Sequence, residues 1–82
     1  PCVVISPNEM NKFLRTIVVA PMTTISKNYP TRVEVKHDNK IGSIVIDQIR
    51  TIDKQRVIRI LGELSKPEIK ETKSVIKETY VD

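Results

Sequence analysis

The sequence predicts a mainly β fold, and two features of it carry that prediction. The chain has 10 valines and 12 isoleucines against 3 leucines, with 7 threonines beside them. These β-branched side chains fit the pleated surface of a sheet. Most apolar residues also fall into short runs that are separated by polar turns. Short strands with tight turns in a chain of 82 residues favour a barrel or a strongly curled sheet.

Continuous or alternating apolar runs predict five strands. They cover residues 2–5, 16–22, 32–36, 41–50 and 57–61. We expect the third and fourth to form a hairpin that turns at Asp38 and Asn39, with Gly42 at a bulge or bend. A short helical insert is expected to begin at a capping box of Ser6 and Glu9 and to end near Phe13. A short turn over residues 54–56 is expected to follow Asp53.

A C-terminal helix is expected over about residues 66–79. Ser65 and Glu68 have the spacing of a capping box, and Pro67 falls in the first helical turn. Ile69, Ile76 and Tyr80 share one face, and Val75 lies beside it. We expect this face to pack against the barrel rather than against a second copy or a partner. Residues 1–82 are then expected to form a single domain.

Several classes of protein are excluded by composition. No apolar run approaches the length of about 20 residues that a membrane span needs. Cys2 is the only cysteine, so no disulfide forms within the chain, and we expect it to be a buried apolar side chain. His37 is the only histidine and is expected to be exposed in the hairpin turn. No metal or other cofactor is expected, and the lone cysteine with no signal-peptide pattern predicts a cytoplasmic protein.

The net charge of +4 is concentrated in the first part of the chain. Residues 1–40 carry 6 basic and 3 acidic groups, a balance of +3. Residues 41–65 contribute +1, and residues 66–82 contribute zero. This distribution permits a polyanionic partner such as RNA without requiring one. The three aromatic residues argue against a base-stacking platform.

Two polar clusters remain as candidate sites. The first follows the second expected strand: Thr23, Thr24, Ser26, Lys27 and Asn28. Hydroxyls at a strand end with a nearby lysine can hold a phosphate oxyanion, and the alternative is an ordinary loop. The second begins at Asp47 and Gln48, which interrupt an apolar strand, and extends to Arg56. Burying such groups without partners is costly, so the cluster indicates an internal hydrogen-bond network or a binding face.

At these clusters the sequence resembles the MazF/PemK family of toxin endoribonucleases. Four stretches carry the resemblance in the family's order and spacing: PCVVISP at 1–7, VAPMTT at 19–24, YPTRV at 29–33 and DQIRTID at 47–53. The resemblance implies an SH3-like, partly open barrel with a C-terminal helix, forming a homodimer. It also implies sequence-specific, metal-independent cleavage of single-stranded mRNA, leaving a 2′,3′-cyclic phosphate and a 5′-hydroxyl.

The resemblance also implies roles for individual residues. Thr23 matches the family's catalytic threonine, which stabilises the phosphate oxyanion. Five further residues match positions that line the family's RNA groove: Thr24, Lys27, Asp47, Gln48 and Arg50. The implied partner, besides RNA and a second copy, is an antitoxin with a disordered acidic segment, which suits a basic toxin.

The sequence departs from the family pattern at its start. In the family, a first strand and a long loop ending in a catalytic arginine precede the proline that matches Pro1. We expect that segment to belong to a longer protein, the alternatives being a truncated gene and a deliberate cut. Two other functions stay open. Because the arginine is absent, one is an inactive remnant that binds RNA or antitoxin only. Because related toxins share the architecture, the other is a gyrase-targeting toxin.

Overall fold

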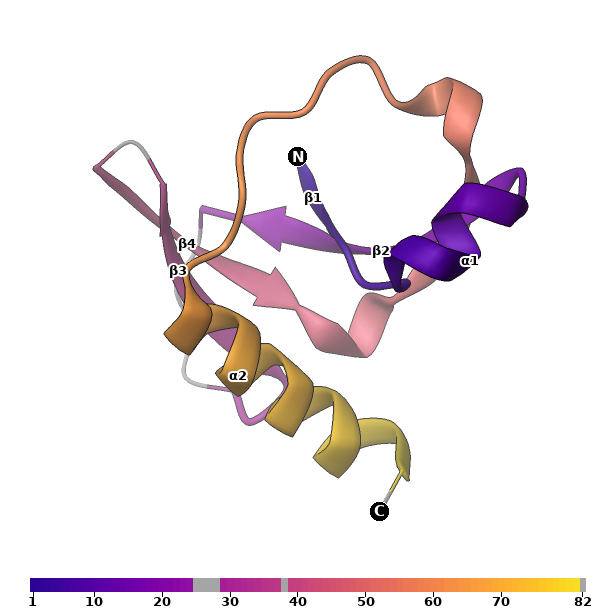
Figure 1. The fold of residues 1–82 in the computed structure, drawn as a ribbon. Coiled ribbons are helices and arrows are strands. Elements are labelled where there is room, and N and C mark those ends of the chain that lie inside the picture. The colour runs from indigo at the N-terminus through magenta and orange to yellow at the C-terminus, as the bar shows by residue number, and fades with distance from the viewer. Residues whose placement is uncertain (25–28, 38, 82) are drawn as a thin grey trace.

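The structure is a computed structural model that describes residues 1–24, 29–37 and 39–81. These residues form five strands and two α-helices, joined by 3₁₀ turns (Figure 1). The strands are β1 (Cys2–Val4), β2 (Thr16–Thr23), β3 (Arg32–His37), β4 (Lys40–Val45) and β5 (Arg50–Asp53). The helices are α1 (Asn8–Phe13) and α2 (Lys66–Ile76), and α2 continues as a π-helical turn over Lys77–Val81.

Strand β2 organises the sheet, because it pairs with three neighbours, all antiparallel. One edge of β2 pairs with β1, with Val3 opposite Ala20. The start of β2 pairs with β5, and its end pairs with β4 at Met22 and Thr23. Strand β3 then pairs with β4 to complete the order β1-β2-β4-β3. The result is a curled half-barrel, which confirms the expected fold class.

The β3–β4 hairpin forms as expected. Arg32 lies opposite Val45, and the pairing continues without a gap to His37 opposite Lys40. Asn39 has φ of 63°, the left-handed conformation that asparagine tolerates better than most residues. His37 is exposed, as expected. Of the bulge or bend expected at Gly42, the bulge does not form, because Gly42 pairs regularly with Val35.

A buried apolar cluster lies between the sheet and α2. Ala20, Val33, Val35, Ile44, Ile46 and Val75 form it. Val75 comes from α2, so the helix packs against the sheet as expected, and Figure 1 shows α2 lying beside β3. Within the described ranges, no helix is long and apolar enough to span a membrane.

The N-terminus of α2 is fixed by the predicted capping box. The Ser65 amide donates to the Glu68 carboxylate at 2.8 Å, and the Glu68 amide donates to Ser65 Oγ at 3.3 Å. The Lys36 amide of β3 also donates to Glu68, at 2.8 Å. The backbone hydrogen bonds from Ser65 and then Lys36 lower the pKa of Glu68 below its ordinary value. Glu68 therefore caps the helix and ties it to the sheet.

Two predicted strands differ from those in the structure. The expected strand 41–50 is divided by a 3₁₀ turn, Ile46–Gln48, and pairing resumes in β5. Residues 57–61 were expected to be a strand and are not one: they lie in an extended segment, drawn in orange, that arches from β5 towards α2 (Figure 1). Ile58 and Ile60 are 97% and 86% exposed there. Among the described residues, no strand pairs with this segment, so its ladder hydrogen bonds are not formed.

Two predictions near the N-terminus are also wrong. Ser6 does not cap α1; its hydroxyl donates to Asn11 Oδ1 and accepts from the Val18 amide at 3.0 Å. Ser6 therefore links α1 to β2. Cys2 is exposed rather than buried, because β1 is only three residues long and places Cys2 at its end.

Candidate functional site

Thr23 lies at the end of β2, where that strand pairs with β4. It is opposite Ser43, so the two hydroxyl-bearing side chains lie on the same face of the sheet. Thr23 is half-buried and Ser43 is 2% exposed. The neighbouring Gly42 allows this close pairing: a Cβ at that position would lie 2.9 Å from the Thr23 carbonyl oxygen. The tight approach fixes the backbone on which the Thr23 side chain is mounted.

The same face continues onto β3. Glu34 lies opposite Ser43, so Thr23, Ser43 and Glu34 form a polar row across three strands. Side chains alternate along a strand, so Arg32 shares this face two residues before Glu34. The Arg32 guanidinium lies 5.2 Å from the centre of the Tyr29 ring. Alternation along β3 predicts that Arg32 and Glu34 share a face. That Thr23 joins them across β4 could not be predicted from local sequence.

Asp47, Gln48 and Arg50 follow the end of β4. Asp47 and Gln48 are exposed in the 3₁₀ turn, and Arg50 is the exposed first residue of β5. Ser43 and Arg50 both pair with β2, at Thr23 and Val19. The segment between them therefore runs beside the second half of β2. The turn is held in place because the Ile46 amide donates to the Thr31 carbonyl and Tyr80 Oη donates to the Ile46 carbonyl.

The expected site residues are thus brought together in part. Thr23 and the Asp47–Gln48 turn lie along the same edge of β2. Arg50 pairs with Val19, which is four residues before Thr23 on β2, about 13 Å away at about 3.3 Å per residue. Thr24 is exposed directly after β2. Lys27, with Ser26 and Asn28, falls outside the described residues. Asp47 and Gln48 are not buried, so of the two readings of this cluster the exposure favours a binding face.

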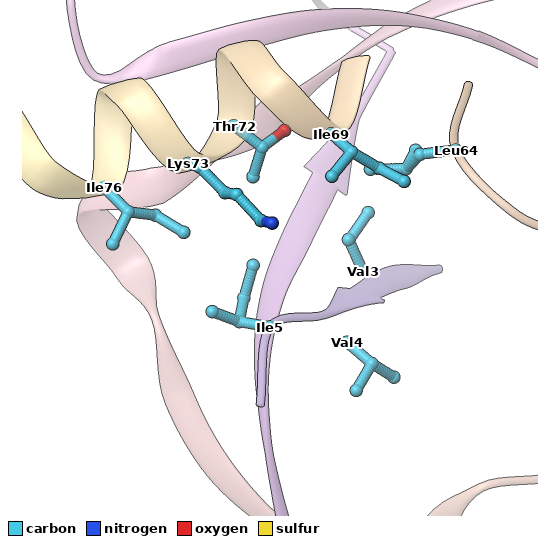
Figure 2. Close-up of a pocket in the computed structure, with 8 residues that line it drawn as sticks. All are labelled: Val3, Val4, Ile5, Leu64, Ile69, Thr72, Lys73 and Ile76. Carbon is cyan, nitrogen blue, oxygen red and sulfur yellow. The ribbon is translucent and has the colours of Figure 1, made fainter. Parts of the chain in front are cut away.

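Two hollows lie elsewhere on the described surface. One, of about 420 Å³, is lined by Arg15, Asp53, Lys54 and Gln55. It lies at the start of β2, the end opposite Thr23. The other, of about 110 Å³, lies between β1 and α2, and Figure 2 shows its mainly apolar lining, with the Lys73 side chain among it. The Thr72 hydroxyl in its wall already donates to the Glu68 carbonyl at 2.7 Å. Neither hollow is lined by any of the expected site residues.

Comparison with known proteins identifies the family. Residues 1–80 match the model of the PemK-like, MazF-like toxins of type II toxin–antitoxin systems. The chain belongs to this family. It is 37% identical to the protein named endoribonuclease MazF of Staphylococcus saprophyticus, over 93% of this chain and 68% of that protein. Membership confirms the resemblance on which the site residues were chosen.

Solved MazF structures have the same fold. The chain superposes on the Mycobacterium tuberculosis toxin MazF-mt6 with a TM-score of 0.88 at 21% identity, covering 99% of this chain and 85% of that one. It superposes on a MazE–MazF structure from Deinococcus radiodurans with a TM-score of 0.83 at 25% identity, covering 95% and 77%. At these identities the superpositions support the half-barrel and its C-terminal helix as the MazF fold.

Proposed function

We propose that this chain is the toxin of a type II toxin–antitoxin pair and that it cleaves single-stranded mRNA. The observation that carries the proposal is its membership of a toxin family together with a relative that is named an endoribonuclease. That relative favours RNA over gyrase as the target. The exposed polar Asp47–Gln48 turn beside the Thr23 strand end offers hydrogen-bonding groups to a single strand.

The proposed reaction needs no metal or other co-reactant. The 2′-hydroxyl loses its proton as its oxygen attacks the adjacent phosphorus, and the bond from phosphorus to the 5′-oxygen breaks. The leaving 5′-oxygen takes up a proton, so no proton is gained or lost overall. The products are a 2′,3′-cyclic phosphate and a 5′-hydroxyl. Thr23 would donate a hydrogen bond to a non-bridging phosphate oxygen as negative charge develops on it. The end of β2 is held in position because Ser43 pairs with Thr23 and Gly42 lets β4 approach the Thr23 backbone closely.

The other groups of the site would bind the RNA. Asp47 and Gln48 would read base edges, since an exposed carboxylate accepts from a base amino group and an amide both donates and accepts. Thr24, Lys27 and Arg50 would contact the backbone, with the two cations neutralising phosphates. The sequence cleaved would then depend mainly on the Asp47–Gln48 turn.

Two protein partners are part of the proposal. Val4 and Ile41 are 50% and 55% exposed, and the strand register places both on the Thr23 face. Exposed apolar side chains on that face, together with the family resemblance, support a homodimer formed through it. A cognate antitoxin with an acidic disordered segment would bind to this chain, since the negative charge of that segment complements the chain's net charge of +4. A MazE–MazF structure is among the similar folds.

The Thr23→Val substitution tests the ribonuclease proposal. It keeps the shape of the side chain and removes the hydroxyl, so cleavage of a long single-stranded RNA should fall about a hundredfold or more. Thr16→Val is the matched control, because Thr16 is an exposed threonine at the other end of β2. It should leave cleavage unchanged, and both variants should keep the wild-type melting temperature within a few degrees.

The assay follows product ends, because a 2′,3′-cyclic phosphate with a 5′-hydroxyl identifies cleavage by the 2′-hydroxyl. The Thr23→Val preparation, purified in the same way, controls for contaminating nucleases that use the same chemistry. The chain is assayed alone and with any sequence that its gene encodes before Pro1. RNA that is bound but left intact in both preparations would contradict the ribonuclease proposal and assign a binding role. If the chain inhibits gyrase and leaves RNA intact, it is a gyrase-targeting toxin instead.

A further inference from the structure

We propose that Arg32, positioned by Tyr29, is an additional RNA phosphate-binding residue beside the Thr23 site. This inference rests on the proposed action on RNA, and it concerns residues to which the family resemblance assigned no role. Arg32 is the first residue of β3, and Tyr29 comes just before that strand. The Arg32 amide donates to the Tyr29 carbonyl at 3.1 Å, so a tight turn joins the two residues.

The geometry of the pair prepares the guanidinium for an anion. It lies 5.2 Å from the centre of the Tyr29 ring, which fixes its position by a cation–π contact. Its Nε atom is buried and has no hydrogen-bond acceptor among the described residues. A buried N–H group without an acceptor destabilises the folded state, because it has lost its hydrogen bonds to water. A phosphate satisfies Nε–H and an Nη–H together in a bidentate contact, so a small rotation of the guanidinium onto RNA would relieve the cost.

The position of Arg32 in the sheet determines which phosphate it would bind. Arg32 lies on β3 and Thr23 on β2, with β4 between them. At about 4.8 Å per strand, the two backbones are about 10 Å apart across the sheet. With its guanidinium held against the Tyr29 ring, Arg32 would bind a phosphate next to the one that Thr23 contacts. It also lies opposite Val45, two residues before the exposed Asp47, so the bound strand would continue towards the Asp47–Gln48 turn.

Salt-dependent binding of RNA tests this inference. The probe is a short fluorescein-labelled, 2′-O-methylated single-stranded RNA of mixed sequence, which cannot be cleaved because it lacks the attacking hydroxyl. Affinity is measured by anisotropy between about 50 and 200 mM salt. Arg32→Gln should weaken binding about tenfold or more at the lower salt. It should also make the slope of log K against log salt shallower by about 0.7, the value for one phosphate contact on a single strand.

Two further variants separate charge from geometry. Arg32→Lys keeps the charge and loses the planar fork, so the salt slope should stay near the wild-type value while the affinity falls. Lys12→Gln is the matched control, because its ammonium also lies over an aromatic ring, 5.9 Å from the centre of Phe13. Lys12 belongs to α1, which comes just before the start of β2. Thr23 lies at the other end of β2. The loss of Lys12 should leave the affinity and the slope unchanged.

The outcomes distinguish this inference from the proposed function. If the wild-type chain does not bind the RNA, the proposed function fails and this inference fails with it. If the wild type binds and Arg32→Gln binds with the same affinity and slope, only the role of Arg32 is overturned. If Arg32→Gln lowers the melting temperature without changing the salt slope, Arg32 is a structural residue and the inference is also overturned.

Discussion

At the scale of single residues, Gly42 is the position where the sheet tolerates least change. A methyl group there would lie 2.9 Å from the Thr23 carbonyl oxygen, closer than side-chain carbons approach backbone atoms. Gly42→Ala should therefore push β4 away from the end of β2 and lower the free energy of unfolding by about 1–3 kcal/mol. Urea unfolding measures this loss, and RNA cleavage should fall as well because Thr23 is displaced.

Ser74→Ala is the control for Gly42→Ala. Ser74 is exposed on α2, so its change to alanine should leave stability the same or slightly higher. Equal stability of the Gly42→Ala variant and the wild type would show that the two strands separate without cost. That result would contradict the role given to Gly42 in positioning Thr23.

The sequence predicted a bulge or bend at Gly42 and did not predict its close contact with Thr23. A glycine in a strand predicts either a bulge or a close approach of two backbones. The choice depends on which strand lies beside it, and the contact with Thr23 joins residues that are 19 positions apart. The exposure of Cys2 has the same origin. An apolar run predicts burial, whereas burial at Cys2 requires a neighbour that the described sheet does not place there.

At the scale of elements, prediction succeeded where the signal is local. The capping box of α2 and the β3–β4 hairpin depend on residues a few positions apart, and both form as expected. The 3₁₀ turn at Ile46–Gln48 was not predicted, because an apolar run does not show where a strand leaves one partner and joins another. Residues 57–61 have the composition of a strand, but no strand of the described sheet pairs with them, and they are extended and exposed.

The link between α2 and the sheet should depend on pH through Glu68. Hydrogen bonds from the Ser65 and Lys36 amides favour the ionised carboxylate and lower its pKa from the ordinary value of 4.5. The stabilisation is complete above that unfolded-state pKa and is lost as the pH falls through the lower folded-state value. Glu68→Gln should cost roughly 1 kcal/mol at neutral pH, and its difference from the wild type should shrink as the pH falls below 4.5.

Denaturant unfolding at a series of pH values measures that difference. Glu71→Gln is the control, because Glu71 is an exposed glutamate on the same helix. It changes the net charge equally and should show no comparable change across this pH range. A constant difference between Glu68→Gln and the wild type from neutral to acidic pH would contradict the assigned role of the Glu68 carboxylate.

At the scale of the whole molecule, the candidate site is assembled from distant parts of the chain. Thr23, Arg32 and Asp47 come together because β2, β3 and β4 pair in the order β2-β4-β3. Thr23 and Asp47 could be chosen from the sequence through the family resemblance. Local chemistry alone left an ordinary loop open for the Thr23 cluster and an internal hydrogen-bond network open for the Asp47 cluster. The Tyr29–Arg32 pair was not chosen in that way, because its geometry appears only when the turn before β3 is formed.

The C-terminal turn should stabilise the site from the opposite side of the sheet. Tyr80 Oη donates to the Ile46 carbonyl at 2.7 Å, and Ile46 is the buried first residue of the turn that carries Asp47 and Gln48. Tyr80→Phe removes this part-buried hydrogen bond, which should cost about 0.5–1.5 kcal/mol. The amides of Asp47 and Gln48 should then exchange faster with solvent, and the affinity for non-cleavable RNA should fall.

Hydrogen exchange measured by NMR and anisotropy with the 2′-O-methylated RNA test these effects together. Val81→Ala is the matched control, since Val81 adjoins Tyr80 and is 71% exposed. It should change neither the exchange rates nor the affinity. Unchanged exchange at Asp47 and Gln48 in Tyr80→Phe would mean that the turn is held by the Ile46–Thr31 hydrogen bond alone, because that bond is made by the backbone and survives the substitution.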